Sequence, residues 1–195
     1  IRINEVSFDE PSGSPDWVEL YNAGTGPVLL DGYALDDGDT GAGKYILLST
    51  GMVLPPQGYL VVMVDANGVS DRDFSDGVGT LYTGTATTVN LAATEDQVAL
   101  YSHTPLSSAT LVDFVSWVTD GEYGGADART QLPATAGDFW PADAAVEMRD
   151  GGSGYSLGRR RNGEGVGPSA FQSFLHPTRG ASNEPLPSPF PSVLT

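Results

Sequence analysis

Residues 16–22 read Asp-Trp-Val-Glu-Leu-Tyr-Asn, and this stretch carries the pattern that decides the fold. In an extended chain Val18 and Leu20 share one face, while Trp17, Glu19 and Tyr21 share the other. The cluster Ala-Gly-Thr-Gly-Pro at 23–27 then supplies turn residues. The stretch therefore predicts a β-strand that ends in a turn.

Short apolar segments separated by turn residues continue on both sides of this strand, and no long helical periodicity appears. The residues at 59–64 are apolar on both faces, which predicts a central strand, and the loop 102–108 predicts a hairpin between its flanking segments. Together they predict one antiparallel β-sandwich of seven to nine strands, in the immunoglobulin-like range. The segments are residues 1–6, 16–22, 28–30, 33–35, 45–48, 59–64, 97–101, 111–118 and 155–159.

Two regions do not follow this pattern of short apolar segments and turns. Residues 119–152 are irregular and carry the aromatic group Phe139-Trp140-Pro141, which we interpret as a long insertion folded over one end of the sandwich. Residues 184–195 contain prolines at 185, 187, 189 and 191. Alternating prolines cannot donate ladder hydrogen bonds, so this stretch is expected to be an extended tail or linker after a domain at 1–183.

Composition excludes several classes of function. The chain has no cysteine, which rules out disulfides, thiolate zinc sites and a cysteine nucleophile. Its net charge of −16 repels phosphate backbones, so nucleic-acid binding is not expected. No apolar segment approaches the ~20 residues of a membrane span. A processed export signal would explain a chain that starts at Ile1, as would a recombinant start point, and we expect a secreted or cell-surface protein.

The order of these motifs resembles the lamin tail domain, an immunoglobulin-like sandwich that is also found in bacterial secreted proteins. The chain closes on Pro177-Thr178-Arg179-Gly180-Ala181-Ser182-Asn183, with Arg179 where the family usually has a second proline. The other matching motifs are Ile3–Val6, Asp16–Asn22, Leu30–Asp36, Leu54–Val62, Glu95–Tyr101, Leu111–Trp117 and the Ser-Leu-Gly-Arg element Ser156–Arg159. The resemblance implies an all-β, immunoglobulin-like antiparallel sandwich with long loop insertions, and it predicts that Arg159 pairs with a carboxylate inside the domain.

Catalysis is not expected. His103 and His176 are the two histidines, and both lie beside predicted turns. The sequence contains neither a Gly-x-Ser-x-Gly elbow nor a His-Glu-x-x-His motif. We therefore predict a protein that is not an enzyme.

The segment 65–77 is the strongest candidate for chemistry, because its oxygen-bearing side chains suit calcium. It is not an EF-hand, since Asp76 occupies the position that requires glycine and Tyr82 the position of the bidentate glutamate. A solvated acidic loop is the alternative, and residues 36–39 form a second acidic cluster of the same kind. No cofactor is required, and calcium is the one considered, with candidate ligands Asp65, Asn67, Asp71, Asp73 and Asp76.

Interaction sites are expected at two places. Arg160 and Arg161 offer a basic pair to an acidic patch on a neighbouring molecule, or they form a solvated turn. In the tail, Phe190, Val193 and Leu194 are contacts for an adjacent subunit, unless the tail is a plain linker.

Two functions follow as hypotheses. The first is a non-catalytic extracellular structural or interaction module that self-associates, for example as a filament or surface-layer subunit. The alternative is a binding accessory domain of a larger secreted hydrolase or nuclease, stabilised by calcium.

Overall fold

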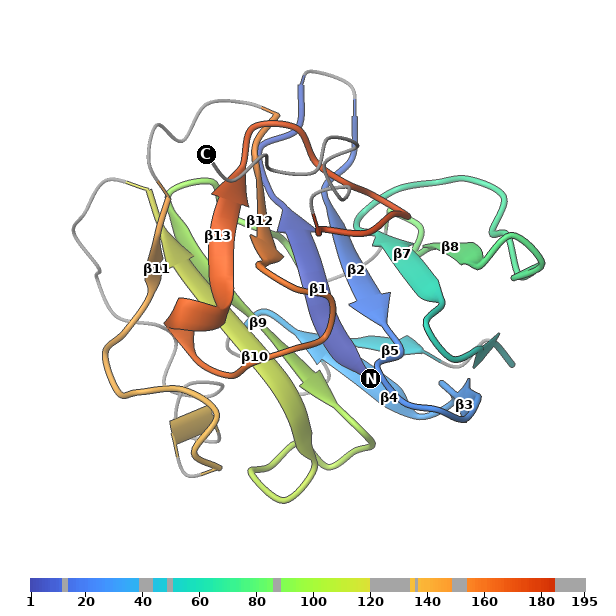
Figure 1. Ribbon diagram of the computed structural model, residues 1–195, viewed down its shortest axis with the longest axis horizontal. Coiled ribbons are helices and arrows are strands. Elements are labelled where there is room, and N and C mark those ends of the chain that lie inside the picture. The colour runs from blue at the N-terminus through green and yellow to red at the C-terminus, as the bar shows by residue number, and fades with distance from the viewer. Residues whose placement is uncertain are drawn as a thin grey trace, which may run out of the picture.

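The structure is a computed structural model that describes residues 1–11, 14–38, 44–48, 51–85, 89–119, 134–135, 137–148 and 154–184. Two β-sheets pack face to face, and the six-stranded sheet lies in front of the five-stranded sheet in Figure 1. Within these residues, no helix is long and apolar enough to span a membrane. The face-to-face packing of the two sheets is the β-sandwich that the alternating pattern predicts.

The front sheet has the order β13-β12-β1-β2-β7-β8. Its central strand pair is antiparallel, and Val18 of β2 lies opposite Val6 of β1. The strand β7, which is apolar on both faces, lies between β2 and β8 as predicted. The bounds are β1 Arg2–Ser7, β2 Trp17–Tyr21, β7 Tyr59–Met63, β8 Val78–Tyr82, β12 Ser156–Arg159 and β13 Phe171–Phe174, with a 3₁₀ turn at Pro168–Ala170 before β13.

The back sheet has the order β11-β10-β9-β4-β5, and β9 and β10 form the expected hairpin. A two-stranded ribbon, β3-β6, adjoins it. The bounds are β3 Val28–Leu29, β4 Tyr33–Asp36, β5 Ile46–Leu48, β6 Val53–Leu54, β9 Glu95–Tyr101, β10 Leu111–Val118 and β11 Val146–Glu147.

Two pairings correct the expectation of a purely antiparallel sandwich. The edge strand β8 runs parallel to β7, and the edge strand β11 runs parallel to β10. A parallel neighbour needs a long connection, and the segments 64–77 and 119–145 provide it. The described residues hold more strands than the seven to nine expected, because β6, β8, β11 and β13 were not predicted.

The core lies between the sheets, where burial of apolar side chains supplies the main driving force. Val18 and Leu20 face this core, whereas Trp17 belongs to a smaller apolar cluster on the outer face of the front sheet. Trp117 stacks on Phe8 with ring centroids 4.4 Å apart. The side chains of β2 thus divide between the core and the outer face, as the alternation of its sequence predicts.

Part of the region 119–152 joins the core. Trp140 is buried and packs edge-on against Phe114, with ring centroids 5.3 Å apart, and it also contacts Phe171. The aromatic group is therefore an anchor. The proposed limits of the insertion and of the domain stay predictions, and residues 185–195 of the tail lie outside the described residues.

Candidate interaction site

The outer face of the front sheet carries two buried carboxyl groups side by side. Glu5 of β1 is the cross-strand partner of Glu19 of β2, and neither residue has measurable exposure. Directly opposed side chains of like charge normally destabilise a strand pair. This pair persists because both carboxyl groups accept hydrogen bonds from the segment that follows β13.

That segment, residues 175–184, crosses over β1 and β2 in Figure 1. The Thr178 backbone N–H and hydroxyl donate to the Glu5 carboxyl group at 3.0 and 2.5 Å, and the Gly180 N–H donates to Glu19 Oε2 at 2.6 Å. Ser156 of β12 donates a further hydrogen bond to Glu5. The two glutamates therefore hold the end of the domain against the sheet.

Burial decides the charge state of this pair. It raises the pKa of Glu19 to about 8, and the nearby charge of Glu5 adds to the effect, although hydrogen bonds from Asn4 and Gly180 oppose it. Burial also raises the pKa of Glu5, against hydrogen bonds from Ser156 and Thr178. Removing a carboxylate from water penalises its ionised form, so each of the two groups holds its proton to a higher pH than a glutamate in water does.

Three asparagines complete the same network. Asn4 sits at a β-bulge in β1, and its Nδ2 donates to Glu19 Oε1 at 2.9 Å. Asn183 Nδ2 donates to the backbone carbonyls of Asn4 and Arg159 at 3.1 and 3.0 Å. Asn162 Oδ1 accepts from the Asn183 N–H at 3.0 Å. The asparagine that ends the chain's closing motif thus links three separate segments.

Arg159 fulfils the prediction drawn from the Ser-Leu-Gly-Arg element. Its side chain is fully buried, and Nη2 donates to Asp113 Oδ2 of β10 at 2.5 Å. Nε donates to the Ile3 carbonyl at 2.7 Å, and Nη1 donates to the carbonyls of Glu164 and Gly165 at 2.9 and 2.8 Å. The guanidinium also lies 4.5 Å from the centre of the Phe171 ring. Arg159 is therefore a structural residue that joins the two sheets.

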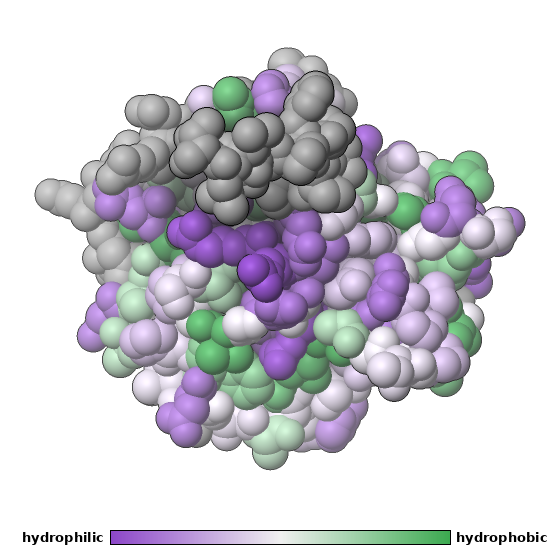
Figure 2. Space-filling model, in the orientation of Figure 1, coloured by the Kyte–Doolittle hydropathy of each residue, from purple (hydrophilic) through white to green (hydrophobic). Residues whose placement is uncertain are grey.

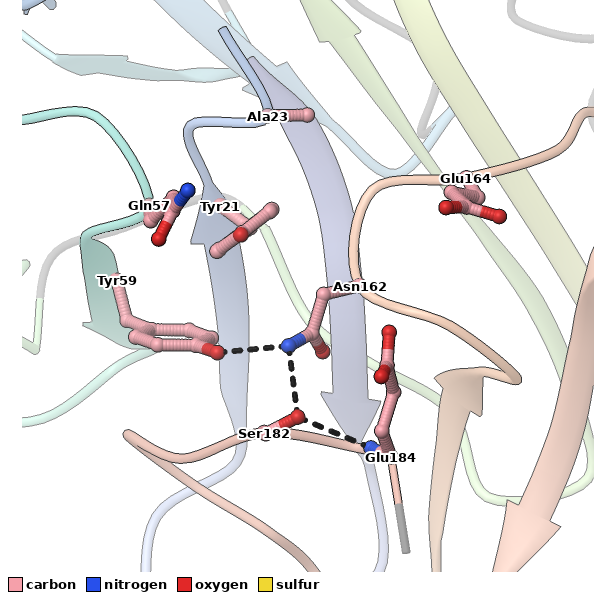
Figure 3. A pocket seen from close by; sticks show the side chains of 8 residues that line it. All are labelled: Tyr21, Ala23, Gln57, Tyr59, Asn162, Glu164, Ser182 and Glu184. Carbon is pink, nitrogen blue, oxygen red and sulfur yellow. Dashed lines mark hydrogen bonds between the residues drawn. The ribbon is translucent and has the colours of Figure 1, made fainter. Parts of the chain in front are cut away.

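A shallow cavity of about 470 Å³ opens beside this network. Figure 2 shows hydrophilic residues gathered over the middle of the face that the front sheet presents. Tyr59 and Asn162 lie in the cavity wall, and Asn162 Nδ2 donates to the Tyr59 hydroxyl at 2.8 Å and to Ser182 Oγ at 2.9 Å (Figure 3). The lining residues are Tyr21, Ala23, Gln57, Tyr59, Asn162, Glu164, Ser182 and Glu184.

The sequence did not single out this cavity. A signal was present, because Tyr21 lies on the same outer face as Trp17 and Glu19, and large residues on an outer face need a cover. Tyr59 joins Tyr21 only through the register of β2 and β7, in which the two residues are partners. The rest of the wall comes from Ala23 and Gln57 beside these two strands and from loops at 160–165 and 182–184, which no local pattern places there.

The candidate calcium ligands lie in the connection between β7 and β8. Asp71 Oδ1, Asp73 Oδ1 and Asp76 Oδ1 accept hydrogen bonds from the N–H groups of Asp73, Ser75 and Val78 at 2.9 to 3.0 Å. Asp65 lies at a turn with a positive φ of 48°, and Asn67 is exposed. Among the described residues, no three His, Cys, Asp or Glu side chains gather in a group that could hold a metal ion.

This connection also protects a sheet edge. The Asp71 N–H donates to the Thr80 carbonyl at 2.8 Å, and the Thr80 N–H donates back to Asp71 at 3.0 Å. The bridge covers the outer side of β8, where unpaired backbone groups would otherwise invite another strand. Within 65–77, the acidic side chains therefore shape turns along an edge.

Arg160 and Arg161, the two remaining candidates that the structure describes, are exposed. Arg160 donates from Nε to the Ser169 carbonyl at 3.1 Å and from Nη1 to Gln172 Oε1 at 3.0 Å. The Arg161 side chain is 71% exposed, and its Nη1 lies 4.0 Å from Glu164 Oε2. Phe190, Val193 and Leu194 lie outside the described residues.

The histidines are not brought into a catalytic arrangement in the part of the chain that the structure describes. His103 is exposed, and its Nδ1 shares a hydrogen bond of 2.9 Å with the hydroxyl of its neighbour Ser102. His176 is exposed in the segment after β13. Neither residue lines the cavity beside Tyr59 or the second one, of about 370 Å³, beside Trp17.

Comparison with known proteins supports the resemblance seen in the motifs. The family model described as the lamin tail domain matches residues 1–119. No curated protein matches the chain, and no solved structure does.

Proposed function

The chain belongs to the lamin tail domain family, and from this premise we propose that it is a self-associating structural module that works outside the cell. The family is an immunoglobulin-like, non-catalytic one whose domains mediate protein interactions. The net charge of −16 supports a protein partner over nucleic acid, and it suits a protein that stays soluble in the extracellular medium.

One observation carries the proposal of self-association. Among the described residues, β13 pairs with β12 on one side and has no strand partner on the other. Ser173 in this strand is exposed, and Leu175 just beyond it is 58% exposed. An unpaired edge strand offers backbone donors and acceptors to a second chain.

The partner that we propose for this edge is the tail of a second copy. Its sequence supplies three apolar contacts, Phe190, Val193 and Leu194, in a stretch whose prolines at 185, 187, 189 and 191 favour an extended arm. The acidic surface of the neighbouring molecule would contact Arg160 and Arg161. Arg160 donates a hydrogen bond to Gln172 of β13, so it lies beside the same edge.

Sedimentation velocity and electron microscopy of the full chain test this proposal. We expect concentration-dependent polymers, which a triple change Phe190→Ser, Val193→Ser and Leu194→Ser disperses. Ser173→Lys should also disperse them, because a lysine on an edge strand blocks pairing. Val69→Ser removes an apolar residue that is 92% exposed and serves as the control. A full chain that stays monomeric at every concentration would overturn the proposal.

The accessory-domain alternative rests on the oxygen-rich connection 65–77, whose carboxylates would have to move together around calcium, because no three of them form a metal-holding group in the described residues. It requires a native chain that carries a hydrolase or nuclease domain as well. Melting temperatures measured with calcium and with a chelator test the metal, and the Asp73→Asn variant should lose any rise in melting temperature that calcium causes. Equal melting temperatures in both solutions would remove the calcium site.

A further inference from the structure

The cavity beside Tyr59 has an aromatic floor. Tyr21 of β2 and Tyr59 of β7 are cross-strand partners with ring centroids 5.0 Å apart and planes inclined by 41°. Figure 3 shows the two rings side by side, with Asn162 reaching toward the Tyr59 hydroxyl. The same Asn162 amide holds Ser182, so the loops on either side of the floor are tied together. The aromatic surface is therefore built before any ligand arrives.

Carboxylates supply the charge of the cavity. Glu164 and Glu184 belong to its wall, and none of the lining residues is basic. Burial raises the pKa of Tyr59 to about 12, and the neighbouring Tyr21, Glu19 and Glu184 add to the rise. Burial, followed by the charge of Glu184, also raises the pKa of Tyr21. Burial is the main cause of both rises, and it opposes charge of either sign. The smaller contribution of Glu184 to both rises shows that a negative charge lies close to the two rings, and a negative charge attracts cations.

We propose that this cavity receives an arginine side chain of a partner protein. The flat guanidinium stacks on a tyrosine ring and directs several N–H donors at carboxylates in the same plane. It is also more weakly hydrated than a lysine ammonium, so it loses less on entering a half-buried site. Glu184 provides the main acceptor, and the Tyr21–Tyr59 pair provides the ring faces. Glu164 lies in the same wall but already faces Arg161 of this chain, so it adds to the negative charge of the cavity.

This inference rests on the proposed role as a protein-interaction module, but it does not depend on self-association. The arginine belongs to any partner that presents it on an exposed segment, and a second copy of this chain is one such partner. Binding of a short peptide is therefore measured at protein concentrations where the chain is dispersed. A failure of polymer formation then leaves this result unaffected.

Nuclear magnetic resonance titration with the blocked tripeptide acetyl-Gly-Arg-Gly-amide tests the site. We expect the signals of Tyr21, Tyr59 and Asn162 to shift, whereas the peptide with citrulline in place of arginine should leave them unchanged. Citrulline has nearly the same shape without the charge, so it isolates the electrostatic contribution. The lysine peptide should bind more weakly than the arginine peptide.

Variants locate the binding. Glu184→Gln should weaken the arginine peptide about threefold to tenfold, and Tyr21→Ala should do at least as much. Glu147→Gln, which changes an exposed carboxylate on the back sheet, should leave the affinity unchanged. Circular dichroism melting confirms that each variant is folded. Equal shifts with arginine and citrulline, affinity unaffected by both variants, or shifts caused only by a neutral disaccharide such as maltose would each overturn the proposal.

Discussion

Arg159 of β12 and Asp113 of β10 form an ion pair between the two sheets, with Nη2 and Oδ2 separated by 2.5 Å and side chains that are 0% and 2% exposed. Asp113 Oδ2 also accepts the Ile3 N–H at 2.8 Å. The pair therefore ties β1, β10 and β12 together at one point. Burying two charges costs free energy, but breaking such a pair leaves one of them without compensation, which costs more.

Replacing this arginine should reveal its role. Arg159→Lys keeps the charge but loses the donors that reach the carbonyls of Ile3, Glu164 and Gly165, so we expect the free energy of unfolding to fall by about 2–4 kcal/mol. Arg160→Lys, at the adjacent exposed position, should change it by less than about 0.5 kcal/mol. Urea unfolding followed by tryptophan fluorescence measures both, and equal losses in the two variants would contradict this account.

The pKa of Glu19 predicts how stability depends on pH. The folded-state pKa of about 8 lies above the usual value of 4.5, so the folded state binds the proton more tightly than the unfolded state. The stabilisation that this tighter proton binding gives to the folded state is fully present below pH 4.5, and it is lost as the pH rises through 8. The glutamine of Glu19→Gln does not titrate in this range. As the pH rises from 4.5 to 8, the free energy of unfolding of the native chain should therefore fall relative to that of the variant.

Urea unfolding at several pH values in this range checks the difference, and Glu147→Gln on the exposed edge of the back sheet is the matched control. Comparing two chains at each pH cancels the general repulsion among the other acidic groups. A constant difference between the native chain and Glu19→Gln across the range would show that Glu19 titrates normally.

Asn183→Ala should loosen the end of the domain. The change removes the donors for the buried carbonyls of Asn4 and Arg159. It also removes one of the two acceptors within reach of the Thr178 hydroxyl, whose oxygen lies 2.6 Å from Asn183 Oδ1. Unsatisfied buried groups cost about 1–3 kcal/mol each. Amide hydrogen exchange in residues 175–184 should accelerate, while exchange in the β9–β10 hairpin stays slow. Asn90→Ala, at an exposed position, is the control, and equal exchange in both variants would disprove the role of Asn183.

Gly158→Ala should also destabilise the fold. A Cβ at Gly158 would lie 2.8 Å from Asn183 Nδ2 and 2.8 Å from Phe174 Cε2, closer than real contacts allow. The Phe174 ring and the C-terminal segment must shift to make room, at a cost of about 1–3 kcal/mol. Gly26→Ala meets no atom within 4 Å and serves as the control in a thermal melt. Equal melting temperatures would show that the site yields without cost.

Alternation along each strand was enough to predict the sandwich. It separated Val18 and Leu20 from Trp17 and Glu19, because side chains of neighbouring residues in a strand point to opposite sides. The structure then showed that Val18 and Leu20 face the core. The pairing of segments 97–101 and 111–118 was also predictable, because a short loop joins them. Arg159 was identified through the family resemblance, which indicated a carboxylate partner but not which one.

The tertiary structure alone decided which residues meet across strands. No local pattern shows that Glu5 lies opposite Glu19, that residues 175–184 cover both, or that Tyr59 joins Tyr21 in a cavity. Register and strand order depend on contacts between distant segments, and a shift of one residue would turn every side chain to the opposite face. Polar residues such as Asn4 and Glu19 look like surface residues in a sequence, and only their hydrogen-bond partners from the far end of the chain allow them to be buried.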